Sequence, residues 1–202
     1  MIDVKTITDL HKKTVQQWHE HEIENHYTGF LSVVCRQHER NFRLWHQEDI
    51  ARSPDVSDKE LAEVKRRIDR FNQERNDFIE RLDDCLIQEL GAKRVVPRAD
   101  ARLNTETPGS VMDRLSILSL RLFHMHEQAD REDASREHRE KVREKLTVLY
   151  QQHRDLSDSL QELLDDIFAG RKLLKIYRQM KMYNDESMNP YLYNAKNKKP
   201  AA

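Results

Sequence analysis

Apolar residues recur every three to four positions along most of the chain, which is the period of an α-helix. The pattern predicts a first helix over Thr6–His21, a second that ends at Arg52 and a third that continues to about Leu90. Pro54 ends the second helix, because the residue before a proline avoids the helical region. Ser57 or Asp58 can cap the third helix, and residues 22–28 either bend the chain or join the first two helices.

The second half of the chain repeats this organisation after a loop. Residues 92–108 contain two prolines and few apolar groups, which favours one long loop between two helical halves. From Val111 to Met125 apolar residues occur almost all round the helical wheel, which predicts a central helix capped by Ser110. A long amphipathic helix follows from the charged segment 130–144 and ends near Gly170, and a shorter one is expected over Lys172–Met182.

These elements predict an all-α fold, an antiparallel bundle of five or six helices, with more than about 60 % helix and no sheet. Four glycines and five prolines among 202 residues support this prediction, since sheets need many turns. We expect a single domain over residues 1–195, with a helical hairpin over 4–90 and a second helical half over 109–183. Residues 196–202 are expected to form a disordered tail.

The charges of the chain nearly cancel, with 35 basic and 36 acidic residues. No global field would attract nucleic acid or an acidic membrane, and we predict neither as a partner. No apolar run approaches the roughly eighteen residues of a membrane span, and the N-terminus lacks the pattern of a signal peptide. Cys35 and Cys85 are expected to be buried, reduced thiols. We therefore expect a cytoplasmic protein, and homo-oligomerisation stays open.

Ionised side chains interrupt the apolar stripes of the second and third predicted helices. Glu48 and Arg52 fall within the stripe that contains Trp45, and Arg75 lies near the centre of the stripe on the next helix. Burying an unpaired charge costs several kcal/mol. We therefore predict that Glu48, together with Asp49, pairs with Arg52 and Arg75.

Asparagines extend this cluster. Asn41 lies in the same stripe as Glu48, and Asn72 and Asn76 lie one turn apart beside Arg75. Because Asn is a weak helix former, such positions suggest side-chain hydrogen bonds to a neighbouring segment. The candidate network consists of Asn41, Glu48, Arg52, Asn72, Arg75 and Asn76. Two interpretations stay open: a structural network that closes on itself, or a pocket for a ligand.

The sequence lacks the motifs of phosphate loops, nucleophile elbows and helical metal sites: G-x-x-x-x-G-K-[ST], G-x-G-x-x-G, G-x-S-x-G, H-E-x-x-H and E-x-x-H. Glu22 and His26 form an i, i+4 pair that could hold a divalent ion, although a solvated hinge explains the same segment. His126 lies close to the apolar stripe of its helix and is expected in the core. We predict no cofactor and no metal site.

Four segments, in this order, resemble the bacterial "domain of unknown function 4254" family: NFRLWHQEDIAR, VKRRIDRFNQERNDFIERLD, TPGSVMDRLSILSLRLFHM and GRKLLKIYRQMKMYNDESMNPYLY. The likeness extends over nearly the whole chain. It implies an all-helical cytoplasmic protein that is often encoded near glycosyltransferase genes for lipopolysaccharide or other envelope glycans. It implies no established activity.

Two shorter segments, Leu44–Arg52 and Gly109–Leu118, are similar to L-W-x-x-E-D-x-x-R and G-E-x-x-D-[KR]-[IL]-[ST]-I-L elements of other small helical proteins from glycan gene clusters. The order is reversed here, and Ser110 stands where those proteins usually have Glu. This likeness implies one constellation formed by Trp45, Glu48, Asp49, Arg52, Asp113, Arg114 and Ser116. As an alternative, Asp113 is an acid at a helix N-terminus and Arg114 an exposed base.

Two classes of function follow. The first is a non-catalytic helical partner or scaffold for glycosyltransferases or other glycan-assembly proteins. The second is a small enzyme or binder for a nucleotide sugar or sugar phosphate. It would use the buried cluster of Glu48, Asp49, Arg52, Asn72 and Arg75, in which arginine would clamp the phosphate. A cluster that closes on itself favours the first class, and polar groups that line an open pocket favour the second.

Overall fold

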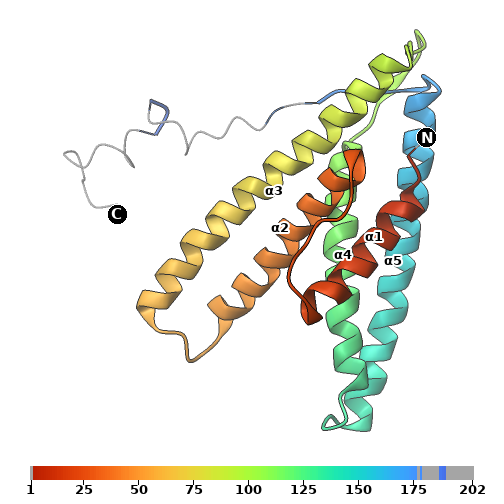
Figure 1. Ribbon diagram of the computed structural model, residues 1–202. Helices are drawn as coiled ribbons and strands as arrows, with labels where there is room; N and C mark the ends of the chain where they lie inside the picture. The colour runs from red at the N-terminus through yellow and green to blue at the C-terminus, as the bar shows by residue number, and fades with distance from the viewer. Residues whose placement is uncertain (1, 177, 179–186, 190–202) are drawn as a thin grey trace.

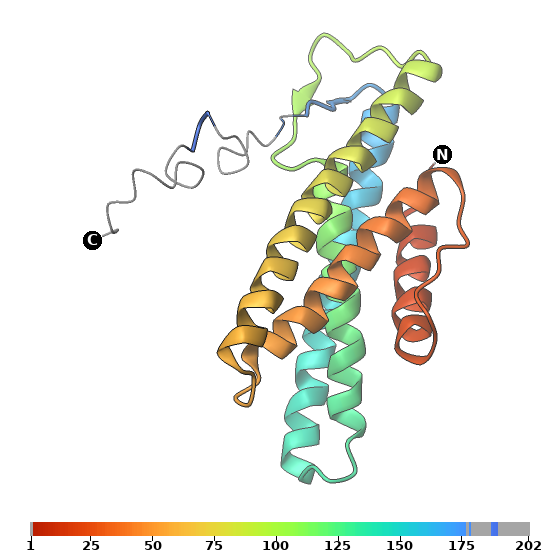
Figure 2. The same cartoon turned by 60° about the vertical axis from the view of Figure 1, so that its left-hand side comes forward.

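The computed structural model describes residues 2–176, 178 and 187–189. Five helices account for 74 % of these residues, which confirms the all-α prediction. They are α1 (Val4–Glu20), α2 (Gly29–Arg52), α3 (Asp58–Ala92), α4 (Pro108–Asp130) and α5 (Arg136–Phe168). The helices α2 and α3 form one antiparallel hairpin and α4 and α5 a second, while α1 packs against α4, α2 and α5 (Figures 1 and 2).

Side-chain caps begin most of these helices. Asp3 accepts hydrogen bonds from two backbone N–H groups of α1, and Ser57 and Ser135 do the same for one N–H group each at the starts of α3 and α5. The helix α4 begins two residues before the predicted cap, Ser110, because Thr107 is the capping residue. Pro108 follows at the first helical position, where its missing N–H costs nothing.

The prediction of no sheet is wrong in one place: a short parallel strand pair joins the two halves of the chain, where β1 (Arg102–Leu103) pairs with β2 (Lys172–Leu173). The sequence predicts a helix over Lys172–Met182. The structure describes residues 172–176 and 178 of this segment, and none of them is helical, so the prediction is wrong there. The chain leaves α5 through Gly170 at φ +70°, and a Cβ there would lie 2.7 Å from the carbonyl oxygen of Val96. The predicted tail, 196–202, lies outside the described residues.

The central position predicted for the fourth helix is confirmed, since Met112, Leu115 and Leu120 of α4 are fully buried. The main core draws apolar side chains from all five helices: Ile7 and Trp18, Val34 and Phe42, Leu82 and Leu86, Val111, Met112, Leu115 and Leu120, and Leu160 and Leu164. Among the described helices, none has a stretch that is both long and apolar enough to span a bilayer.

The crossing of α3 and α4 depends on Gly109. A Cβ at this position would lie 2.6 Å from the carbonyl oxygen of Ile79, so the two backbones approach closely. The N–H of Gly109 donates a hydrogen bond of 2.7 Å to Oδ1 of Asp83, a buried carboxylate on α3. This contact fixes the first turn of α4 on α3, and it directs the next turn, with Asp113, toward the middle of α3.

Candidate functional site

The carboxylate of Asp113 is the centre of a buried polar network. Asp113 is only 4 % exposed, and its carboxylate oxygens face hydrogen-bond donors from α2 and α3. Oδ1 accepts hydrogen bonds from Gln37 Nε2 at 2.6 Å, Asn41 Nδ2 at 2.9 Å and Arg75 Nε at 2.7 Å. Oδ2 accepts a further hydrogen bond from Nη2 of Arg75, which makes the ion pair bidentate.

The network continues across the bundle from Asp113 to α1. Asn41 Nδ2 also donates to the hydroxyl of Ser116 at 2.8 Å, and that hydroxyl lies 2.7 Å from His38 Nδ1. The ring of His38 packs against Trp18 and against the buried ring of His11, at centroid distances of 5.3 and 4.6 Å. Polar contacts therefore connect α2, α3 and α4, and ring contacts extend them to α1.

The electrostatics agree with a closed arrangement. The hydrogen bonds from Arg75 to Asp113 raise the pKa of the guanidinium above its usual value, against the opposing effect of burial. Burial lowers the pKa of His38 to about 3 and holds the pKa of His11 well below its usual value. Both histidines are therefore neutral at pH 7, and the Arg75–Asp113 pair carries the charge of the network.

Four of the residues predicted from the sequence come together in this network: Asn41, Arg75, Asp113 and Ser116. The predicted pairing of Glu48 with Arg75 is wrong. The predicted pairing of Glu48 with Arg52, one turn further along α2, is confirmed at 3.1 Å, and the Arg52 side chain is 69 % exposed. The carboxylate that neutralises the charge of Arg75 is that of Asp113 on α4. The apolar stripes of α2 and α3 alone could not identify a partner on a third helix.

The other predicted residues lie outside the network. Arg114 points away from the core and pairs with Glu106 at 3.0 Å on an exposed surface. Asp49 is exposed on α2, while Asn72 and Asn76 are half-buried on α3. In the described part of the chain no hydrogen bond connects these three residues with Asp113. Trp45 stacks on His124, with the ring centroids 5.0 Å apart.

Sequence reasoning missed two members of the network. Gln37 and His38 are fully buried, and both contribute side chains to it. Gln37 lies one turn before Asn41 on α2, so the helical period that selected Asn41 could also have found Gln37. His38 is recognisable only through its spatial neighbours on α1 and α4.

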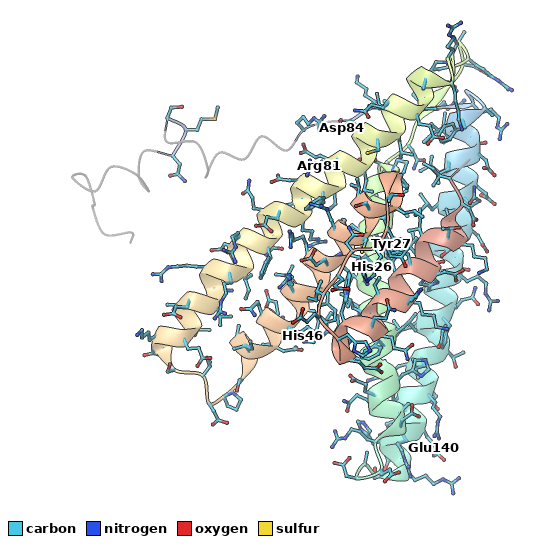
Figure 3. The ribbon with its side chains drawn as sticks, viewed as in Figure 1. His26, Tyr27, His46, Arg81, Asp84 and Glu140 are labelled. Carbon is cyan, nitrogen blue, oxygen red and sulfur yellow. The ribbon has the colours of Figure 1, made fainter. Side chains whose placement is uncertain are left out.

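A second polar group lies between α1, α2 and α4, where three histidines meet. One ring nitrogen from each of His19, His46 and His124 lies within 4.8 Å of the other two, so these residues could hold a metal ion. Figure 3 shows His46 on α2 near the end of α1. Burial, with smaller effects of the two neighbouring histidines, lowers the pKa of His46 and favours the neutral ring. The predicted burial of His126 is wrong: His126 is exposed and contacts Tyr150.

A protein-family model matches most of the chain. The sequence model described as "Protein of unknown function (DUF4254)" matches residues 31–176 of the 202, which include α3 to α5 and all of α2 except its first two residues. No curated protein and no solved structure matches the chain. The matched residues include every hydrogen-bonded member of the Asp113 network, whereas α1, with His11, Trp18 and His19, precedes them.

Proposed function

The chain belongs to the DUF4254 family of proteins of unknown function, and we propose that it is a non-catalytic helical partner of the enzymes that assemble bacterial envelope polysaccharide or lipopolysaccharide. We place this role in the cytoplasm, where nucleotide-sugar donors are available to glycosyltransferases. The expectation of glycan assembly comes from the family resemblance given above. The non-catalytic part of the proposal rests on the geometry of the Asp113 network.

The commitment of Asp113 and Arg75 to each other within that network is the observation that carries the proposal. A carboxylate that acts on a substrate, or an arginine that clamps a phosphate, must present free lone pairs or N–H groups to the ligand. Asp113 instead accepts four hydrogen bonds from protein donors, and Arg75 uses both Nε and Nη2 on Asp113. Four of the side chains that the sequence offered as a ligand site, those of Asn41, Arg75, Asp113 and Ser116, thus bind one another.

The long helical faces support a role in protein contacts. Along α5, Arg136 pairs with Glu140 and Lys141 with Glu137, and all four side chains are at least half exposed. Such exposed pairs contribute little to the stability of the fold, with a typical value of about 0–1 kcal/mol. They therefore remain available for charged groups of a partner protein.

The alternative function, a small enzyme or binder for a nucleotide sugar or sugar phosphate, would require Arg75 to exchange Asp113 for a phosphate. That exchange leaves a buried carboxylate without its cation, which is strongly unfavourable. The remaining arginine of that hypothesis, Arg52, is exposed and already paired with Glu48. The geometry therefore favours the partner role.

The experiment that tests the proposal is deletion of the gene, followed by electrophoretic analysis of the surface polysaccharide. We expect shortened or missing polysaccharide, restored by the wild-type gene and by one that encodes Arg114→Met. The purified protein should neither hydrolyse a nucleotide sugar nor transfer its sugar. Unchanged polysaccharide in the deletion strain would contradict the role in glycan assembly, and sugar turnover by the purified protein would support the alternative.

A further inference from the structure

We propose that His19, His46 and His124 form a binding site for a divalent first-row transition-metal ion, with Zn²⁺ as the expected occupant. The three side chains come from α1, α2 and α4, and one ring nitrogen of each lies within 4.8 Å of the other two. The site shares no residue with the Asp113 network. It also does not depend on the proposed role in polysaccharide assembly, so either proposal can fail without the other.

Buried nitrogens without partners are the observation that points to a ligand here. The Nε2 atoms of all three histidines are buried, and none has a hydrogen-bond partner among the described residues. A buried polar atom without a partner is costly, and folded proteins contain few of them. Because one ring nitrogen of each histidine lies within 4.8 Å of the other two, a cation held between the three rings would explain these buried nitrogens.

The other ring nitrogens fix the orientation of two of these rings. Nδ1 of His19 lies 2.6 Å from the carbonyl oxygen of Val15, and Nδ1 of His124 lies 2.7 Å from Oε2 of Glu127. A carbonyl and a carboxylate can only accept, so Nδ1 carries a proton, and in the neutral form of each ring the lone pair is on Nε2. Metal-bound histidines are commonly held in this way, by a backbone carbonyl or a carboxylate on the opposite ring nitrogen.

The ring planes also suit a shared ion. They make angles of 70° between His19 and His46, 76° between His19 and His124, and 81° between His46 and His124. Rings in this arrangement do not stack on one another, and their edges can converge on one point. With Zn–N bonds of about 2.0–2.1 Å, tetrahedral ligands lie about 3.3 Å apart, so the nitrogens need to approach by about 1.5 Å at most.

An aromatic shell keeps the three rings in place. Phe123 stacks on His19 at a centroid distance of 4.1 Å, and Trp45 stacks on His124 at 5.0 Å. Phe42, which is buried, packs its edge against His46 at 4.5 Å. Rings that are held by packing lose little freedom when an ion binds, which favours binding.

The donor set determines the class of metal. Neutral imidazoles suit Zn²⁺, Cu²⁺, Ni²⁺ and Fe²⁺, whereas Mg²⁺ and Ca²⁺ take oxygen ligands. A water molecule would complete four-coordination. Because the three ligands come from three helices, the bound ion would cross-link α1 to α2 and α4. This proposal revises the sequence prediction of no metal site.

The test uses full-length protein purified without a histidine tag, stripped with a chelator and titrated with Co²⁺ and then Zn²⁺. We expect one Co²⁺ per chain, with the visible absorption of a four-coordinate ion, and displacement of Co²⁺ by Zn²⁺. His46→Phe retains aromatic packing and removes one ligand, so it should weaken binding at least about tenfold and abolish the rise of the melting temperature on Zn²⁺ addition. Binding of less than one Co²⁺ per chain to the wild type would overturn the proposal.

A matched control lies two residues from one ligand. His126 is on α4 like His124, but it contacts Tyr150 on the exposed side, and His126→Phe should bind Co²⁺ as the wild type does. Equal affinities of wild type and His46→Phe, or an equal loss in His126→Phe, would overturn the proposal. If His46→Phe fails to fold, Glu127→Ala is the variant to test. Glu127 accepts the hydrogen bond that orients His124, and its own side chain is 52 % exposed, so the change should not disturb the fold. We expect about tenfold weaker Co²⁺ binding from this change, and unchanged affinity would refute the site.

Discussion

Replacing Arg75 with Met should destabilise the protein strongly, because the change leaves the carboxylate of Asp113 buried without its cation. The Asp113 side chain is 5 % exposed and loses two of its four hydrogen bonds in the variant. Breaking a buried ion pair by removing one partner typically costs 3–5 kcal/mol. The Arg75 side chain is 24 % exposed, so water can partly replace it, and we expect about 3 kcal/mol. Urea unfolding followed by circular dichroism measures this difference.

The neighbouring Arg114 provides the matched control. Its side chain is 55 % exposed and pairs with Glu106 at the surface, so Arg114→Met should cost less than about 1 kcal/mol. Glu48→Gln should behave like Arg114→Met, since the partner of Glu48 is the exposed Arg52. In a double-mutant cycle, Arg75→Met and Asp113→Asn should couple by about 1–3 kcal/mol. Equal costs for Arg75→Met and Arg114→Met, or additive effects in the cycle, would refute the closed network.

Two further predictions concern protonation and packing. Burial holds the pKa of His38 at about 3 and that of His11 far below normal, whereas the unfolded chain binds protons near pH 6.5. With chelator present, the free energy of unfolding should therefore fall as the pH drops from about 6.5 to about 5, by up to about 1.4 kcal/mol per pH unit for each histidine. His38→Gln should reduce this dependence of the free energy of unfolding on pH. His138→Gln changes an exposed residue and should leave it unaltered. Equal slopes in the two variants would contradict the prediction. Gly109→Ala should lower the free energy of unfolding in urea by about 1–3 kcal/mol, because its Cβ would lie 2.6 Å from a backbone oxygen. As a control, the Cβ of Gly91→Ala would meet no described atom within 4 Å, so this change should be neutral or stabilising. Equal effects of the two changes would refute the close contact.

The helices could be predicted from sequence because their signals are local. The apolar period, Pro54 and Ser57 define the end of α2 and the start of α3 without any knowledge of the neighbours. The strand pair could not be predicted, because Lys172–Leu173 becomes extended only by pairing with Arg102–Leu103 from the other half of the chain. The secondary-structure propensity of a segment depends on its own residues and cannot identify a pairing strand that is distant in sequence.

The site was predictable only in part for the same reason. The stripe analysis correctly selected Arg75 as a charge that needs a partner, but the period of one helix cannot say which other helix supplies that partner. From the sequence, Asp113 also fits an acid in the first turn of a helix, but α4 begins at Pro108 and has no acid in its first turn. The crossing of α3 and α4 at Gly109 instead brings Asp113 to Arg75. The histidines His19 and His124 belong to different helices far apart in sequence, and spacing rules for metal ligands apply within one helix or hairpin.

The most direct test of the closed network is a thermal-shift titration of the wild type and Arg75→Met with nucleotide sugars and sugar phosphates. A ligand at 100 times its dissociation constant stabilises the folded state by about 2.7 kcal/mol, which is readily detected as a rise of the melting temperature. If Asp113 and Arg75 are committed to each other, these ligands should leave the melting temperature of both proteins unchanged. A ligand that stabilises the wild type and loses its effect in Arg75→Met would show that Arg75 is free to bind phosphate, and it would contradict the account.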